Sequence, residues 1–263
     1  MLLSMDSGVS ALDQFQQQLN VIANNIANVN TVGFKAADVN FSDTLSETLG
    51  SNAAGSTQVG TGVQTASITN DFSTPADIAS TGVQSDLAIQ GNGFFVVKDP
   101  TSGNSYVTQD GTFTLDPSGY LVTSSGLRLQ GANGDIQIPP TSGTATMSSY
   151  TIGPTGLINI NYSDSSTATA GPLTLQNFTN PDQLVKAGDN LYTAPAAAGG
   201  LAAAVAPGSG GVGTVVTGSL EMSNVDLAAQ LTALITTQRA YEANSKVVTT
   251  SDNVLQTLVN LVH

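Results

Sequence analysis

The chain has 263 residues, 40% of them hydrophobic and 10% charged, which is enough material for one or two domains with a buried core. A net charge of −13 and only six Lys and Arg residues, none of them clustered, argue against nucleic acid and against an anionic membrane surface as partners. The absence of Cys excludes disulfides and thiolate metal sites, and no stretch reaches the roughly 18 apolar residues that a membrane span needs.

The first thirty residues predict an amphipathic helix from about Ser4 to Asn28. The row Met5, Val9, Leu12, Gln16, Leu19, Ala23 and Ile26 has alternating spacings of four and three and is apolar except at Gln16, and Gly33 then marks a break. The N-terminus has neither a basic n-region nor a long apolar h-region, so we expect no cleavable signal peptide.

The middle of the chain, from about Gly60 to Gly218, is typical of β-structure. Asp116-Pro117-Ser118-Gly119 predicts a turn, because Pro presets φ and Gly accepts a positive φ. Two stretches, Gly50–Thr57 and Ala194–Gly213, are expected to be loops. The candidate strands are residues 64–69, 87–97, 105–115, 120–129, 157–162, 173–178 and 190–193.

A second, longer helix is predicted from about Val225 to Leu261, roughly 55 Å long. Ser223 or Asn224 is the expected N-cap, with Asp226 in the first turn. Apolar residues repeat every seven positions in two rows with a mostly small or polar row between them, which indicates contact with more than one neighbour. The first row is Leu227, Leu234, Tyr241, Val248, Leu255 and Val262, the second is Ala233, Ala240, Val247, Val254 and Leu261, and the middle row is Gln230, Thr237, Asn244, Ser251 and Leu258.

Residues suited to catalysis are scarce. The one histidine, His263, is the last residue, where a side chain is commonly frayed and solvated, which argues against a Ser-His-Asp site. Carboxylates of a glycoside hydrolase pair are available in Asp86, Asp110, Asp116 and Asp135, but Asp at turns and strand ends is far more often structural. We therefore expect no catalytic residue, no cofactor and no metal.

The run Gly91-Asn92-Gly93 has some likeness to a glycine-rich phosphate loop. It lacks the third glycine of that fingerprint and leads into a strand instead of a helix. We interpret it as a bend in a strand, where glycine permits a positive φ and Phe94 and Phe95 pack into the core.

The order of helix, β-rich region and helix predicts an α+β fold, with an all-β central domain and the two terminal helices pairing as a coiled-coil stem. Helices with apolar surface left over are stabilised by neighbouring copies, so we expect self-assembly. From composition alone, an extracellular β-rich adhesin or a phage-tail-like trimer with helical ends is an open alternative.

Three segments of the chain resemble the bacterial flagellar rod and hook axial proteins. The first is Leu19–Lys35, with Asn24, Asn25, Asn28, Gly33 and Phe34, and the second is Thr81–Val97, with Gly91, Gly93, Phe94 and Phe95. The third comprises Gly218–Leu227 and Gln238–Lys246, with Ser223, Asn224, Arg239 and Tyr241.

The resemblance implies a structural subunit of the flagellar shaft and no enzymatic activity. The subunits would form a helical polymer that transmits torque from motor to filament, with the helices around a central channel and the β-domain outside. The implied partners are adjacent rod, hook and junction proteins and the flagellar type III export apparatus, which would export the chain without cleaving a signal. Composition alone suggests the cytoplasm; the resemblance implies the flagellum instead.

On this interpretation the chain has four parts: residues 1–35 as an N-terminal helical stem segment, 36–63 as a connecting loop or extension, 64–218 as the β-rich domain, and 219–263 as the C-terminal stem helix. The side chains expected to pack between subunits are Leu12, Leu19, Ile22, Ile26, Leu227, Leu234, Tyr241, Val248, Leu255 and Val262.

The resemblance leaves open whether the chain forms the rod or the hook segment of the shaft. The length resembles that of the distal rod protein. Four segments look closer to the hook protein, namely Ile68–Ser73, Leu127–Gly131, Ser223–Leu227 and Leu255–Leu261, and the stretch Gly50–Gln58 is short where the distal rod protein tends to have a longer insert. We interpret the chain as a hook-type subunit, with a distal rod subunit as the alternative.

Overall fold

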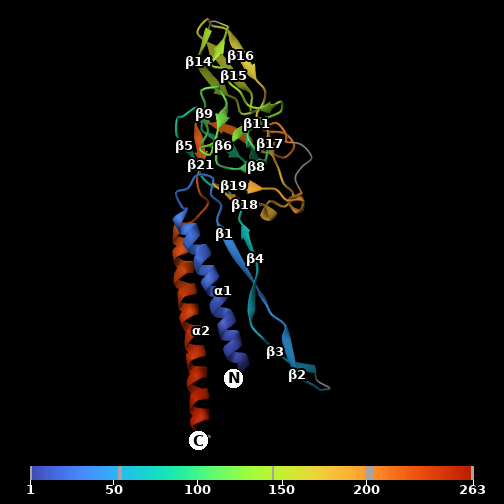
Figure 1. The fold of residues 1–263 in the computed structure, drawn as a ribbon, viewed down its shortest axis with the longest axis vertical. Coiled ribbons are helices and arrows are strands. Elements are labelled where there is room, and N and C mark those ends of the chain that lie inside the picture. Colours follow the sequence, from blue (N-terminus) through green and yellow to red (C-terminus); the bar gives the residue numbers. More distant parts are fainter. Residues whose placement is uncertain (1, 53–54, 144, 200–203, 262–263) are drawn as a thin grey trace. The chain divides into compact units, whose positions relative to one another are not determined.

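The computed structural model describes residues 2–52, 55–143, 145–199 and 204–261, and it confirms the α+β class, with a long helix at each end and strands between (Figure 1). The chain divides into two compact units. Unit 1 comprises Met1–Val29, Ala36–Asp71 and Val225–His263, and unit 2 comprises Asn30–Lys35 and Phe72–Asn224.

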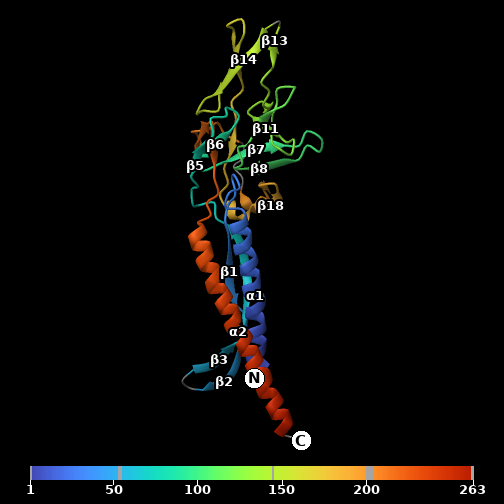
Figure 2. The same cartoon turned by 90° about the vertical axis from the view of Figure 1, so that its left-hand side faces the viewer.

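Unit 1 is built on two antiparallel helices, α1 (Leu2–Ala27) and α2 (Leu227–Leu261), which lie side by side in both views (Figures 1 and 2). Their 26 and 35 residues correspond to about 39 and 52 Å, so α2 continues past the N-terminal end of α1. Both helices were predicted within two residues of their ends. The coiled-coil form of the pairing stays a prediction.

The start of α2 differs from the prediction. Asp226, not Ser223 or Asn224, is the N-cap, because its Oδ1 accepts hydrogen bonds from the backbone N–H groups of Ala228 (2.8 Å) and Ala229 (3.2 Å). Those two N–H groups have no partner inside the helix, so this carboxylate satisfies donors that would otherwise be orphaned.

A long β-hairpin, which we call the arm, completes unit 1. It is formed by β1 (Ala37–Asp43) paired with β4 (Val63–Asn70) and by β2 (Ser46–Asn52) paired with β3 (Gly55–Gly60). It packs on α1 through an edge-to-face contact of Phe15 with Phe41 and a 2.8 Å hydrogen bond from Thr65 to Gln17. Residues 36–63 were expected to be a connecting loop or extension; the loop alternative is wrong, because most of this segment forms strands.

Only part of the arm was predicted: the candidate strand at residues 64–69 lies within β4, whereas β1, β2 and β3 were not predicted as strands. In β1, Ala37, Val39 and Phe41 alternate with polar residues, which is a strand signal, although only Ala37 of the three is buried. The sequences of β2 and β3, SETLGSN and GSTQVG, are mostly polar or Gly and have no such alternation. Residues 53–54, at the tip of the predicted loop Gly50–Thr57, and residues 200–203 of the predicted loop Ala194–Gly213 lie outside the described part of the chain.

Unit 2 is a β-structure in which every paired strand is antiparallel. Its largest sheet has nine strands in the order β18-β19-β8-β7-β11-β10-β9, with β12 on β11 and β17 on β7, and a second sheet has the order β13-β14-β15-β16. Two further pairs are β20 with β6 and β21 with β5. The elements are β5 (Ile78–Ser80), β6 (Leu87–Gln90), β7 (Phe94–Lys98), β8 (Ser105–Thr108), β9 (Thr114–Leu115), β10 (Leu121–Val122), β11 (Arg128–Gly131), β12 (Gly134–Asp135), β13 (Thr141–Ser142), β14 (Ala145–Ile152), β15 (Ile158–Tyr162), β16 (Thr167–Ala170), β17 (Leu175–Gln176), β18 (Val185–Gly188), β19 (Leu191–Thr193), β20 (Thr214–Thr217), β21 (Ser219–Glu221) and two 3₁₀ turns, η1 (Pro181–Gln183) and η2 (Ala196–Ala198).

Each predicted strand contains a strand of the structure, but three of the longest ones are broken in two. Residues 87–97 form β6 and β7, separated by Gly91 and Gly93 with φ of +116° and +142°, which agrees with the predicted bend. Residues 105–115 and 120–129 are likewise divided by turns. The turn at residues 116–119 is confirmed, with Gly119 at a φ of +84°.

The core of unit 2 has two clusters. The larger contains Phe95 and Phe113, whose rings meet edge to face with centroids 5.4 Å apart. The smaller contains Phe94, Phe178 and Tyr192. Both phenylalanines of the second family motif, Phe94 and Phe95, are thus core residues, as predicted.

Candidate functional site: an assembly interface

Unit 2 holds a short segment, Asn30–Lys35, that we call the anchor segment. The backbone N–H of Gly33 donates to the carbonyl of Glu221 in β21 (2.8 Å), and Lys35 Nζ forms an ion pair with Glu221 Oε1 (2.7 Å). The two side chains are only 2% and 7% exposed. A buried charge is costly unless it is paired, so Lys35 and Glu221 hold each other in place across 186 positions of sequence.

Gly33 is required at its position for two reasons. Its φ is +66°, a left-handed conformation that glycine adopts without penalty, and a Cβ there would lie 2.6 Å from the backbone nitrogen of Asp110. The neighbouring residue Phe34 is buried, with Lys186 Nζ 4.8 Å from its ring centroid, and Asn190 Nδ2 donates to the carbonyl of Val32 (2.8 Å). The first family motif therefore fastens this segment into the β-structure.

The asparagines of the first motif divide by role. Asn25 in α1 is buried; its Nδ2 donates to the carbonyl of Ala37 (2.9 Å) and its Oδ1 accepts from the N–H of the same residue (3.0 Å). Its Nδ2 also lies 3.3 Å from Gln230 Oε1 in α2, so one side chain links both helices to the arm. Asn28 Nδ2 donates to the carbonyl of Asn24, a local bond near the end of α1.

The side of α2 that faces α1 is the polar middle row. Thr237 is buried, and Gln230, Asn244 and Ser251 are half-buried. Close approach is possible at Gly8, where a Cβ would lie 3.0 Å from Val248 Cγ2. Because α1 lies over this row, the apolar rows on either side of it are only partly covered.

Several large apolar side chains of α2 are exposed as a result. They are Leu227, Leu231, Ile235, Tyr241, Val247, Val254, Leu258, Val259 and Leu261, the last 77% exposed. Towards the end of the helix, two shallow grooves of about 330 Å³ each run along one face. We call the residues of this face the C-terminal stripe: Val247, Thr250, Val254, Thr257, Leu258 and Leu261.

The side chains that the sequence analysis assigns to subunit packing are distributed unevenly. Leu227 and Tyr241 are exposed; the others are half-buried or buried within the chain, and Val262 lies outside the described residues. The half-buried and buried ones are Leu12, Leu19, Ile22, Ile26, Leu234, Val248 and Leu255. The heptad pattern identifies apolar rows but not which of them α1 covers, and it therefore missed Leu231, Ile235 and Leu258.

The third motif contributes two exposed cations, Arg239 and Lys246. Arg239 lies exposed on α2, and Ser223 and Asn224 are half-buried just before the helix. In unit 2, Gly91 of the second motif fits closely, since a Cβ there would lie 3.0 Å from Gly213 Cα.

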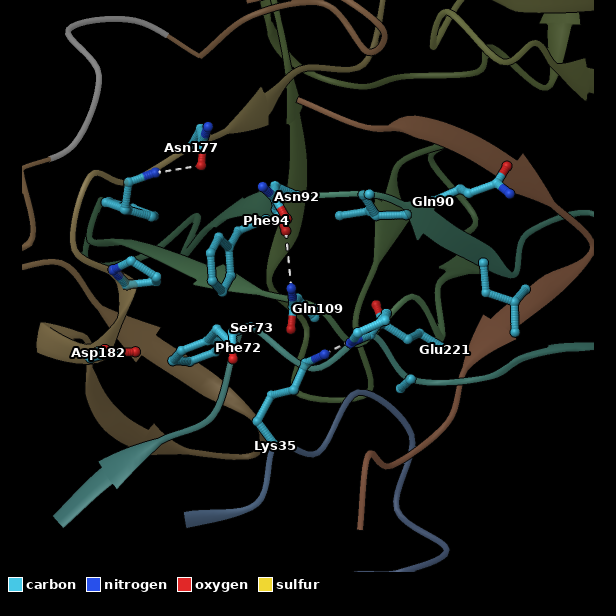
Figure 3. Close-up of a pocket in the computed structure, with 18 of the residues that line it drawn as sticks. Lys35, Phe72, Ser73, Gln90, Asn92, Phe94, Gln109, Asn177, Asp182 and Glu221 are labelled. Carbon is cyan, nitrogen blue, oxygen red and sulfur yellow. Dashed lines mark hydrogen bonds and ion pairs between the residues drawn. The ribbon is translucent and has the colours of Figure 1, made fainter. Parts of the chain in front are cut away.

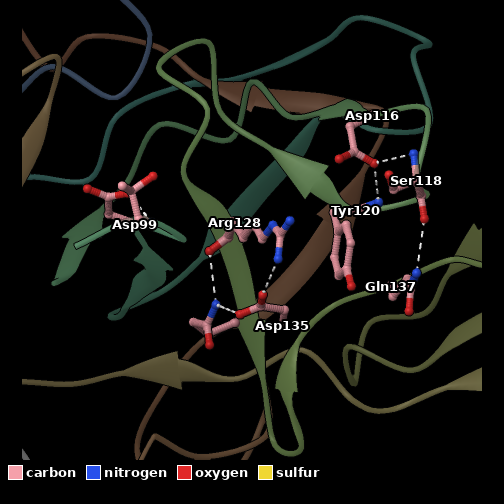
Figure 4. A network of polar contacts seen from close by, with 9 residues as sticks. Asp99, Asp116, Ser118, Tyr120, Arg128, Asp135 and Gln137 are labelled. Carbon is pink, nitrogen blue, oxygen red and sulfur yellow. Dashed lines mark hydrogen bonds and ion pairs between the residues drawn. The ribbon is translucent and has the colours of Figure 1, made fainter. Parts of the chain in front are cut away.

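The four carboxylates considered for catalysis make local contacts typical of turns. Asp116 Oδ1 accepts from the N–H groups of Ser118 (2.8 Å) and Tyr120 (2.7 Å) (Figure 4). Asp110 Oδ1 accepts from the N–H (2.9 Å) and the hydroxyl (2.7 Å) of Thr112, and Asp86 accepts from a threonine hydroxyl.

Asp135 belongs to an exposed network on β11 and β12. It pairs with Arg128 (2.9 Å), whose guanidinium lies 3.9 Å from the ring centroid of Tyr120 (Figure 4). Burial by itself would raise the pKa of the Asp135 carboxyl, but hydrogen bonds from Gln130 and Arg128 outweigh it and lower the pKa below its ordinary value. This network stabilises a hairpin surface.

Within the described residues, no group of three or more His, Cys, Asp or Glu side chains is placed to hold a metal ion. Neither of the two helices, over the residues described, is long and apolar enough to cross a membrane.

Comparison with known proteins accounts for these features. The sequence matches three family models: a flagella basal body rod protein over residues 5–35, a flagellar hook protein FlgE/F/G D1 domain over 88–160, and a flagellar basal body rod FlgEFG protein C-terminal over 216–261. These ranges contain the first and third motifs and the part of the second motif from residue 88 onward.

Several flagellar proteins are similar to this chain over nearly its whole length. The chain is 44% identical to the flagellar basal-body rod protein FlgG of Bacillus subtilis over 270 residues, covering 99% of each chain. It is 34% identical to FlgG of Borreliella burgdorferi, again over 99% of each. The flagellar hook protein FlgE of Borreliella burgdorferi is 41% identical over 140 residues, which cover 50% of this chain and 31% of the relative.

The family models and the whole-length relatives show an axial structural subunit of the flagellum, one that assembles with other flagellar axial proteins. The chain belongs to the flagellar rod and hook protein family, and its place is the basal body and hook region of the flagellum.

Proposed function

We propose that the chain is a distal rod subunit of the flagellar basal body, which polymerises through its terminal helices into a tube that transmits torque. The observation that carries this proposal is the end-to-end similarity to rod proteins, at 99% coverage of both chains. The hook relative supports a hook subunit less well, because less than a third of its length is matched. The hook-type interpretation relied on short motifs, and short motifs carry less weight than a whole-length match.

The apolar surface of α2 supports polymerisation. A chain with a net charge of −13 repels its own copies, so contacts between copies need surfaces without acidic side chains. The two grooves of the C-terminal stripe are lined by Val, Leu, Thr, Ser and Asn side chains and by Lys246, with no Asp or Glu among them. Burying such a stripe between copies removes apolar area from water without bringing carboxylates together.

Adjacent rod, hook and junction proteins and the flagellar type III export apparatus are the partners that this function requires. Uncleaved export through that apparatus is part of the same proposal.

Imaging of basal bodies from a strain that lacks this gene tests rod against hook. A distal rod subunit predicts basal bodies that end within the rod and carry no hook, restored by a plasmid copy of the gene. Basal bodies with a complete rod that end where the hook begins would assign the chain to the hook.

A further inference from the structure

Unit 2 contains a cavity of about 770 Å³ between the turn before β7 and the segment before β5 (Figure 3). Three aromatic side chains, Phe72, Phe94 and Phe178, form one wall, with Pro75 and Pro181 beside them. The volume lies within the range of sites that bind small ligands or a protruding side chain. The aromatic rings and prolines make one wall apolar, while the rest of the lining is largely polar, with Asp77 and Asp182 among it.

One polar atom in this cavity lacks a partner. Gln109 is 5% exposed; its Nε2 donates to the carbonyl of Gly93 (3.2 Å), while its Oε1 is buried with no hydrogen bond from the described residues. Buried side-chain acceptors are nearly always satisfied, so an orphan beside a cavity points to a donor that comes from outside. Lys35 and Glu221, which also line the cavity, already satisfy each other (Figure 3).

The arm of unit 1 carries an exposed apolar side chain beside a backbone donor that is unpaired in the described part of the chain. Leu45, between β1 and β2, is 88% exposed, the highest value among the exposed large apolar side chains of the described residues. Its carbonyl accepts from the N–H of Thr61 (3.3 Å), but its own N–H has no acceptor within the described chain. An isobutyl group next to a free N–H matches an aromatic wall that has an orphan acceptor beside it.

We propose that the cavity of one copy is the receptor for Leu45 of a second copy. The leucine side chain packs against the phenylalanine wall, and its backbone N–H donates to Gln109 Oε1. This inference rests on the proposed function only in requiring that copies of the chain meet.

Charge opposes this contact at long range. Asp43 and Glu47 flank Leu45 in sequence, and Asp77 and Asp182 lie among the lining residues of the cavity. Because exposed like charges are screened by salt, we expect the contact to strengthen as ionic strength rises. A contact driven by salt bridges would weaken instead.

The chain has no Cys, so a thiol-specific cross-linker reacts only with cysteines that are introduced by substitution. Full-length Ser46→Cys protein, which keeps Leu45, is mixed with full-length Ser73→Cys protein, whose cysteine lies at the cavity, and a short bis-maleimide linker is added. We expect at least tenfold more heterodimer than with Ser102→Cys, an exposed position that is not among the cavity residues. Adding Leu45→Asp to the Ser46→Cys chain should abolish the product; equal yields with either partner, or no effect of Leu45→Asp, would overturn the proposal.

A peptide assay tests the same contact without polymerisation. A synthetic peptide of residues 40–47 is titrated onto the full-length chain, and the side-chain amide signal of Gln109 is followed by NMR. Methylation of the Leu45 nitrogen should weaken binding about tenfold on the native chain, and by less than twofold on Gln109→Leu, because only the native chain offers the acceptor.

The outcomes separate the two proposals. If the chain forms tubes but shows neither peptide binding nor cross-links, the proposal that the cavity receives Leu45 is refuted and the proposed rod function is unaffected. If the peptide binds but no tubes form, the proposed rod function is refuted and the Leu45 contact is supported. An N-acetylglucosamine oligomer that perturbs Gln109 where the peptide does not would show the cavity to be a glycan site and overturn the receptor for Leu45.

Discussion

Removing one charge of the buried pair Lys35–Glu221 should destabilise unit 2 far more than removing an exposed one. Glu221→Gln keeps the size and shape of the side chain but leaves the Lys35 ammonium, 2% exposed, without its counter-charge. Breaking a buried pair in this way costs about 3–5 kcal/mol, because the remaining charge stays desolvated. The double variant Lys35→Met/Glu221→Leu should recover most of this loss, since no buried charge is left.

The exposed pair provides the matched control. Asp135→Asn removes the partner of Arg128, where the two side chains are 31% and 29% exposed and 2.9 Å apart, and we expect a loss below about 1 kcal/mol (Figure 4). For a unit of this size, a loss of about 4 kcal/mol lowers the melting temperature by about 10 °C, and a loss below 1 kcal/mol by at most a few degrees.

Near-UV circular dichroism of the full chain is the suitable assay, because five of the six tyrosines lie in unit 2. Equal shifts in melting temperature for Glu221→Gln and Asp135→Asn would refute the reasoning. So would a double variant that is less stable than either single one.

Three further changes have defined outcomes. Gly33→Ala should lower the free energy of unfolding, measured by thermal unfolding, by about 1–3 kcal/mol, because the new Cβ is strained and collides with Asp110. Gly82→Ala is the control: Gly82 has a similar φ of +72° but open space around it, so only the smaller cost of backbone strain is expected. Asp226→Ala should lower stability by about 1 kcal/mol and fray the first turn of α2, visible as faster hydrogen exchange there. Burial raises the pKa of Tyr192 from 10.0 to about 12, so the unfolded chain releases the tyrosine proton at a lower pH than the folded chain does. The free energy of unfolding should therefore fall between pH 10 and pH 12, by up to about 2–3 kcal/mol. Tyr192→Phe should flatten that decline in urea titrations, and an unchanged decline would contradict the assignment.

The elements that could be predicted from sequence are those with strong local signals. The two long helices follow from heptad and three-four spacing over many turns, and the turn at Asp116–Gly119 follows from the φ preferences of Pro and Gly. The break at Gly91 and Gly93 was predicted for the same reason. In each case the determining residues are close together in the chain.

The parts that could not be predicted depend on partners far apart in sequence or on surfaces that another element covers. Nothing near Lys35 indicates Glu221, and nothing in the heptad rows of α2 indicates that α1 covers Thr237 and leaves Leu258 exposed. In the arm, β4 was predicted, and the alternation of Ala37, Val39 and Phe41 was a signal for β1 that was not used. The strands β2 and β3 are mostly polar or Gly, so no periodic pattern distinguishes them from a loop.

The central claim is that the C-terminal stripe joins copies of the chain, and Leu258→Asp tests it most directly. Leu258 is exposed, so an acidic side chain there should leave the fold of the single chain intact, which unchanged circular dichroism would verify. In the contact between copies, however, the same side chain would place an unpaired carboxylate in an apolar environment. Asn260→Asp adds the same group two residues further along α2, at an exposed position outside the stripe. Negative-stain imaging and sedimentation of the purified chains should then find tubes for the native chain and Asn260→Asp and monomers for Leu258→Asp. Normal tubes from Leu258→Asp would contradict the claim.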